Sequence, residues 1–189
     1  PPPSPQRPLL DDVNRMVIFN DLIRNIFSSE IPFRDSCEKL DARIRAAKLD
    51  FQAPSGVPEA LAGCYSRVMA AKSALLYSLN HCLIHCGKNV RNEQQVMRDI
   101  SDALIHTYSM DSTLGKVIEA VSKRGEQANR AEMAIARLIV HEGVKSVRDH
   151  TTDALLGAIK GGELERKLET LSKLTAAMTS HEPVSELKR

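Results

Sequence analysis

The sequence predicts an all-α protein, folded as an antiparallel helical bundle of about four main helices plus N-terminal helices. Residues 59–182 contain no proline, which would remove a backbone donor and clash inside a helix. Aromatic residues make up only 4% of the chain and Trp is absent, whereas β-strands favour aromatic and β-branched side chains. Apolar residues recur at three- and four-residue steps, and no segment alternates apolar and polar residues as a strand does.

Composition divides the chain into five parts. Residues 1–10 begin with PPPSPQRP and are expected to form an extended Pro-rich tail. Residues 11–51 should hold the N-terminal helices, and residues 52–58, with two prolines and a glycine, form a hinge. The bundle then covers 59–182, and a short tail covers 183–189. Because the first residue is Pro1 rather than Met, both a removed targeting segment and missing upstream sequence stay open.

Two helices are expected before the hinge. Asp11 or Asp12 can cap the first, which continues through apolar residues at helical spacing and ends near residues 28–32. The second helix, over residues 35–48, is more polar. Its few apolar residues, Leu40 and Ile44, share one side, so the helix should lie on the surface.

Four longer helices follow, over residues 58–85, 92–123, 129–159 and 163–179. Glycines mark where they end, at Gly87, at Gly125 and at the adjacent pair 161–162. Asn92 and Gln95 have the spacing of a reciprocal capping pair at the start of the second of these helices. Short loops between such helices favour antiparallel neighbours.

One helix carries a regular apolar stripe. Its members are Val96, Ile100, Thr107, Met110, Leu114, Val117 and Val121. With Ala103 between Ile100 and Thr107, the spacing alternates between four and three residues and predicts a buried helix–helix seam. We assign interactions with other helices and other protein chains to it. Gly115, Gly143 and Gly157 lie inside predicted helices, where close helix–helix approach is favoured over a kink.

Several function classes lack their signatures. The net charge is +2, and no dense Lys/Arg run is interleaved with aromatics, so nucleic-acid binding is not indicated. No apolar run approaches the ~18–20 residues of a membrane span, so at most peripheral membrane contact is expected. Four cysteines are too sparse for a disulfide scaffold, and a reducing compartment is the default. No glycine motif for phosphate binding is present.

The segment HCLIHC is the most suggestive constellation for chemistry. Its two ligand types form helical i, i+4 pairs, His81 with His85 and Cys82 with Cys86. One zinc ion could use one pair, but adjacent side chains project about 100° apart, so the four cannot easily converge. The favoured interpretation is two small apolar cysteines in a helix interface with histidines at its polar edge. We therefore assign no metal site, with these four residues as the candidates.

No catalytic residue is assigned either. No glycine pattern of a nucleophile elbow surrounds any serine. Asp149–His150 and the charged residues 165–169 have acid–base side chains, but such spacings on helices usually form a solvated face.

The segment NEQQVMRDISDALIHTYSM at residues 92–110 is followed by STLGKVIEAVSKRG and an Ala-rich helix. In order and spacing, this region resembles the C-terminal helical domain of very-long-chain acyl-CoA dehydrogenase and of its relative in respiratory complex I assembly. The resemblance covers roughly residues 66–173. It implies an all-helical domain that accompanies a flavin-binding catalytic part.

The start of the chain resembles the helix that follows this family's catalytic glutamate, with DDVNRMVIFN matching it. In the family, glutamate, glycine, threonine and asparagine precede the aspartate that matches Asp12; here those positions hold Pro8, Leu9, Leu10 and Asp11. The resemblance therefore implies that proline replaces the base, and a prolyl ring cannot accept a proton. The family's flavin-binding β-domain has no counterpart in these residues.

We expect a non-catalytic, acyl-CoA-dehydrogenase-like subunit of a larger mitochondrial assembly, in the matrix or on the matrix face of the inner membrane and tied to the respiratory chain. Its partners would be other protein chains or a second copy, and the chain itself would hold no cofactor. The alternative is the C-terminal part of an active FAD-dependent long-chain acyl-CoA dehydrogenase whose catalytic domain lies elsewhere. An unrelated four-helix metal or regulatory bundle around HCLIHC is the third hypothesis.

Overall fold

The computed structural model describes residues 7–179, and within that range the chain is all-α, as predicted, with no strand. The six helices are α1 (Arg7–Phe27), α2 (Phe33–Arg45), α3 (Glu59–Cys86), α4 (Gln94–Arg124), α5 (Arg130–Ala158) and α6 (Gly162–Thr179). Two short 3₁₀ turns, η1 (Gly87–Asn92) and η2 (Gln127–Asn129), join α3 to α4 and α4 to α5.

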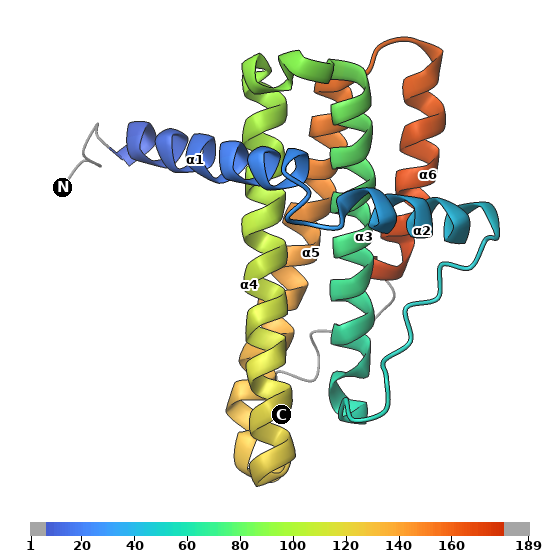
Figure 1. The fold of residues 1–189 in the computed structure, drawn as a ribbon. Coiled ribbons are helices and arrows are strands. Elements are labelled where there is room, and N and C mark those ends of the chain that lie inside the picture. The colour runs from blue at the N-terminus through green and yellow to red at the C-terminus, as the bar shows by residue number, and fades with distance from the viewer. Residues whose placement is uncertain (1–6, 180–189) are drawn as a thin grey trace.

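Helices α3 to α6 run alternately up and down and form the bundle, which confirms the predicted antiparallel architecture (Figure 1). Helix α5 packs against α3, α4 and α6, and α3 packs against α4, α5 and α6. Helix α1 crosses α4 and projects away from the bundle, while α2 crosses α3 (Figure 1). The N-terminal helices therefore lie across the outside of the bundle.

The predicted apolar stripe of α4 is buried within this chain. Its seven residues, Val96, Ile100, Thr107, Met110, Leu114, Val117 and Val121, are at most 7% exposed. They form part of the chain's own core, so they present no surface to another chain, and interactions with partners have to use other residues. A Cβ atom on Gly143 of α5 would lie 2.6 Å from Cγ of Met110, which explains this glycine by close helix approach. Gly115 has no such neighbour.

Three predicted helix starts differ from the structure by two residues or more. Helix α1 begins at Arg7, four residues before the first expected cap, because proline is tolerated in the first turn of a helix. Residues 1–6 of the predicted tail, and all of 183–189, lie outside the described residues. Asn92 does not cap α4, since it ends the η1 turn and Glu93 precedes the helix without a side-chain cap bond. Helix α2 starts at Phe33 rather than at residue 35.

The segment between α2 and α3 is attached to the rest of the chain by Arg43. Its guanidinium donates hydrogen bonds to the carbonyl oxygens of Lys48 and Asp50 and lies 4.8 Å from the ring centroid of Phe51. Phe51 is only 6% exposed and belongs to the core. The chain before the predicted hinge is thus fixed by packing. None of the helices in residues 7–179 has the length and apolar character needed to cross a lipid bilayer.

Candidate functional site

Polar side chains from three helices meet where α1 crosses α4 beside α5. We call the set Arg15, Gln95, Asp99, Asp102, His106 and His150 the polar cluster. Arg15 comes from α1, His150 from α5, and the other four from α4. Among the described residues this cluster joins helices that are distant in the sequence through charged groups, which makes it the strongest candidate for a functional arrangement.

Asp99 is the buried centre of the cluster, with an exposed fraction of 1%. Its Oδ2 atom accepts a hydrogen bond from Nε2 of Gln95 at 2.5 Å. Its Oδ1 atom lies 3.3 Å from Nδ1 of His150 and 3.5 Å from Nε of Arg98. A buried carboxylate is costly unless other groups compensate its charge and fill its acceptor sites. These contacts provide that compensation and link α4 to α5.

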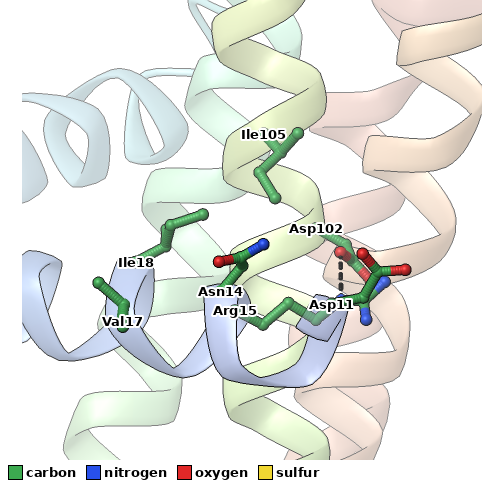
Figure 2. Close-up of a pocket in the computed structure, with 7 residues that line it drawn as sticks. All are labelled: Asp11, Asn14, Arg15, Val17, Ile18, Asp102 and Ile105. Atoms are coloured by element: carbon green, nitrogen blue, oxygen red, sulfur yellow. Dashed lines mark hydrogen bonds and ion pairs between the residues drawn. The ribbon is translucent and has the colours of Figure 1, made fainter. Parts of the chain in front are cut away.

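Asp102 links α4 to α1. Its Oδ1 atom accepts a hydrogen bond from Nε of Arg15 at 2.7 Å, and this bond raises the pKa of Arg15 above its usual value (Figure 2). One residue earlier, Oγ of Ser101 donates to the backbone oxygen of Arg15 at 2.9 Å. The other carboxylate oxygen of Asp102 lies 4.0 Å from Nε2 of His150. Asp102 therefore lies between the α1 and α5 members of the cluster.

The two histidines of the cluster are stacked. The ring centroids of His106 and His150 lie 6.2 Å apart, with 15° between the ring planes. Burial lowers the pKa of His106, and the neighbouring His150 acts in the same direction. His106 is consequently neutral at pH 7 and contributes packing rather than charge.

A groove lies beside the cluster, in the corner between α1 and α4 (Figure 2). Its volume is about 370 Å³ and it is open to solvent. It is lined by Asp11, Asn14, Arg15, Val17, Ile18, Asp102 and Ile105. The lining combines carboxylates and an arginine with three apolar side chains. Such an open corner can take up side chains of another protein, whereas small-molecule sites usually enclose most of their ligand.

The acid–base pair of the cluster is separate from the groove. Asp99 and His150 resemble an acid–base pair, but neither lines the groove. General acid–base catalysis needs the side chain within hydrogen-bond reach of a substrate atom. No serine, threonine or cysteine lines the groove either. The chemistry that the cluster supports is electrostatic attachment of α1 to the bundle.

The candidate metal ligands of HCLIHC do not converge. Cys82 is fully buried, and its Sγ atom contacts the backbone oxygen of Ala154 on α5 at 3.5 Å. Burial raises the pKa of this thiol to about 12. Cys86 is only partly buried. In residues 7–179 no group of three or more His, Cys, Asp or Glu side chains is arranged to hold a metal ion. Cys82 thus behaves as a small apolar residue of a helix interface.

The two histidines of the segment have different surroundings. His81 is buried rather than at a polar edge, with an exposed fraction of 8%, and its ring meets that of Tyr77 at a centroid distance of 4.5 Å. Burial, and then the charge of Lys167, lowers the pKa of His81 to about 4. The other histidine, His85, places Nε2 3.4 Å from a carboxylate oxygen of Glu163 on α6. His85 therefore belongs to the α3–α6 contact, and the buried His81 lies near enough to α6 for the charge of Lys167 to act on it.

The polar cluster was largely missed by reasoning from the sequence, which considered Asp149 and His150 as neighbours. Asp149 instead pairs with Arg148, while His150 turns toward Asp99, 51 residues away in the chain. A local signal does exist on α4. Asp99, Asp102 and His106 follow one another at three- and four-residue steps, which places three polar side chains on one side of the helix.

The exposed apolar side chains are separate from the predicted stripe. They include Val13, Met16, Val17 and Phe27 on α1, Ile105 and Tyr108 on α4, and Ile135, Leu138 and Leu156 on α5. Their exposed fractions run from 41% to 73%. Val17 and Ile105 also line the groove, so the exposed apolar surface continues into it.

Comparisons with known proteins give consistent matches. The family model described as the ACAD9/ACADV C-terminal domain matches residues 64–184, a range that includes the segment 92–110. A curated relative, the probable acyl-CoA dehydrogenase of Bacillus subtilis (strain 168), is 21% identical over 165 residues, which are 87% of this chain and 27% of the relative.

A solved structure shares the fold. The crystal structure of an acyl-CoA dehydrogenase complexed with FAD from Bacillus anthracis matches with a TM-score of 0.79 and 22% identity. The match covers 92% of this chain and 28% of that one. The chain thus spans little more than a quarter of the length of these two proteins.

Proposed function

Because the chain belongs to the family of ACAD9/ACADV C-terminal domains, we propose that it is a non-catalytic helical subunit of an acyl-CoA-dehydrogenase-like assembly. In this role the chain supplies surface for packing against other protein chains. It performs no acyl-CoA oxidation with its own residues.

The polar cluster carries this proposal. Its two carboxylates are already bound to neighbouring side chains: Asp99 to Gln95 and His150, and Asp102 to Arg15. A carboxylate that removes a substrate proton has to be available to that substrate instead. Exposed apolar residues on α1, α4 and α5 also support the proposal, since such surface favours association with proteins.

The proposed location is the mitochondrial matrix or the matrix face of the inner membrane, in an assembly tied to the respiratory chain. This part of the proposal rests on the resemblance to the very-long-chain enzyme and its complex I assembly relative. The two relatives named above are from Bacillus species. Fractionation of source cells followed by immunodetection tests the location. Signal confined to the cytosol would contradict it.

Native affinity purification tests the function. We expect the tagged chain to bring down further polypeptides in fixed proportion, and we expect the purified complex to be inert toward long-chain acyl-CoA in the presence of an electron acceptor. A chain that purifies alone would contradict the packing role. A yellow complex that oxidises acyl-CoA would contradict the non-catalytic role.

A second candidate function is supported by the length of the relatives. The relative from Bacillus subtilis is described as a probable acyl-CoA dehydrogenase, and this chain matches 27% of it. The chain would then be the C-terminal part of an active FAD-dependent long-chain acyl-CoA dehydrogenase of fatty acid β-oxidation. In that case reconstitution with the catalytic part yields stoichiometric flavin and thioester-dependent electron transfer. The flavin content of the purified complex therefore separates the two candidates.

A further inference from the structure

Hydrogen bonds between α1 and α4 hold the two sides of the groove together. Arg15 and Asp102 are joined at 2.7 Å, and Ser101 binds the backbone of Arg15 on the same stretch of α4. Further along α1, Phe19 and Ile23 are fully buried and also hold this helix against the bundle. Because these contacts already fix the angle between α1 and α4, a ligand that enters the groove has little structure left to order. A preformed surface reduces the free-energy cost of binding.

The groove has an apolar side and an acidic end. Val17 is 55% exposed and Ile105 is 41% exposed, and both line it together with Ile18. Tyr108, one helical turn beyond Ile105, is 73% exposed and extends the apolar side along α4. Apolar side chains at this exposure, beside a hollow, are typical of a surface that receives a partner.

Carboxylates dominate the charged groups at the groove. Asp11 and Asp102 line the groove with two negative charges and Arg15 with one positive charge, which leaves a net charge of one negative in the lining. Asp12 is a further, exposed carboxylate beside the lining residue Arg15. Asp102 and Arg15 compensate each other, and Asp12 lies 3.3 Å from Arg15. Asp11 is exposed and forms no ion pair with another described residue, so it is the carboxylate most available to an incoming cation. Charge complementarity therefore favours a basic partner over an acidic one.

From this combination we propose that the α1–α4 groove docks an amphipathic helical segment of a partner protein, with its apolar residues beside Val17 and Ile105 and a Lys or Arg beside Asp11 and Asp12. Helix-in-groove recognition uses apolar anchors at helical spacing, and flanking charges set the orientation. The inference rests on the proposed packing function and names the surface and the kind of partner that function would use.

Two synthetic helical peptides test the occupant. They share the same leucines at helical spacing, and one carries lysines on its flanks where the other carries glutamates. Fluorescence anisotropy against the full chain measures their affinities. Physiological salt screens long-range attraction between charges, so the difference reports charges that lie close together in the complex. We expect saturable binding of the lysine peptide and about tenfold weaker binding of the glutamate peptide. Equal affinities, or no saturable binding of the lysine peptide, would overturn the proposal.

Matched variants locate the site. Ile105→Ser and the pair Asp11→Asn with Asp12→Asn should each weaken binding of the lysine peptide about tenfold, because Ile105 and Asp11 line the groove and Asp12 lies beside the lining residue Arg15. Leu156→Ser on α5, which removes a similarly exposed apolar residue, and Asp21→Asn on α1 should change it less than about twofold. Equal losses in Leu156→Ser and Ile105→Ser would show nonspecific adhesion and overturn the proposal.

Two further readouts separate this inference from the proposed function. Sedimentation of the purified chain detects self-association, and a dimer abolished by Ile105→Ser would assign the groove to a second copy and overturn the proposal. Recovery of the native complex by tagged wild-type and Ile105→Ser chains tests the groove in its assembly. We expect Ile105→Ser to recover less of the other polypeptides. Full recovery by Ile105→Ser would refute the groove while leaving the packing function intact.

Discussion

The Nε atom of Arg15 on α1 lies 2.7 Å from Oδ1 of Asp102 on α4, and this ion pair joins the first described helix to the bundle. The two side chains are only 27% and 14% exposed, so solvent weakens their attraction less than it would on the open surface. His150 on α5 lies 4.0 Å from the other oxygen of Asp102. The orientation of α1 therefore depends on charged groups of two bundle helices.

Asp102→Asn should destabilise the fold because it leaves the charge of Arg15 without its main partner. We expect a loss of about 1–2 kcal/mol in the free energy of unfolding, measured with urea. Glu119→Gln is the matched control, since its ion pair with Lys123 lies on the surface of the same helix, and it should leave the urea midpoint unchanged. Equal effects of the two substitutions would contradict a special role for the α1–α4 pair.

Acidification should destabilise the fold through His81. Burial lowers its pKa to about 4, so the folded chain holds this imidazole neutral while the unfolded chain takes up a proton near pH 6.5. The contribution to stability is complete above about pH 6.5 and is lost as the pH falls toward 4, by up to about 3 kcal/mol. Urea unfolding from pH 7.5 to 4.5 measures it. His81→Gln should flatten this dependence, and an unchanged slope in that variant would contradict the assignment.

Gly143→Ala should destabilise the α4–α5 interface. The added Cβ would meet Cγ and Sδ of Met110 at 2.6 Å, and Met110 is fully buried, so the side chain has little room to move. The expected loss is about 1–2 kcal/mol. Gly115→Ala provides the opposite case: nothing lies within 4 Å of its Cβ, and alanine should stabilise the helix by about 0.5–1 kcal/mol. Thermal unfolding of the two variants should shift in opposite directions.

The four cysteines should differ in reactivity. Cys37, Cys64 and Cys82 are buried, and burial raises the pKa of Cys37 to about 11 and of Cys82 to about 12. Cys86 is only partly buried. A thiol-specific reagent at pH 8, followed by peptide mass analysis, should therefore label Cys86 first in the native chain, because the reaction needs accessible thiolate. Labelling of Cys82 before Cys86 would contradict its position in the α3–α5 interface.

The helices could be predicted because their apolar spacing is a local property. The ends of α3 at Cys86 and of α4 at Arg124 fall beside Gly87 and Gly125, as the glycine positions indicate. The start of α4 was predicted less well. There the η1 turn occupies residues that resemble a capping pair, and Gln95 turns to Asp99 instead of to the backbone.

The polar cluster could not be derived in the same way. Asp99 and His150 are 51 residues apart, and Arg15 and Asp102 are 87 residues apart. Which helix faces which is decided by packing of the whole bundle, so a charged residue at a helical step can equally well lie in solvent. The sequence identified the resemblance to the family and the all-α class, but the cluster becomes visible only in three dimensions.

The apolar stripe of α4 shows a second limit of prediction from the sequence. Periodicity places Val96 and Ile100 on one side of the helix, and the structure buries both completely. The pattern cannot distinguish packing within a chain from packing between chains, because both bury the same apolar surface. Of the side chains left for partners, Ile105 lies outside the stripe of α4, whereas Val17 follows the apolar spacing of α1 and is still exposed.

The most direct test of the packing role is the size at which the chain travels in its native setting. Sedimentation of a gently lysed source extract, with immunodetection of the chain, gives that size. We predict that the chain sediments with a complex several times larger than its own 20.9 kDa, and that Ile105→Ser shifts part of it toward the free species. Sedimentation of the wild-type chain entirely as a free 20.9 kDa species would contradict the account.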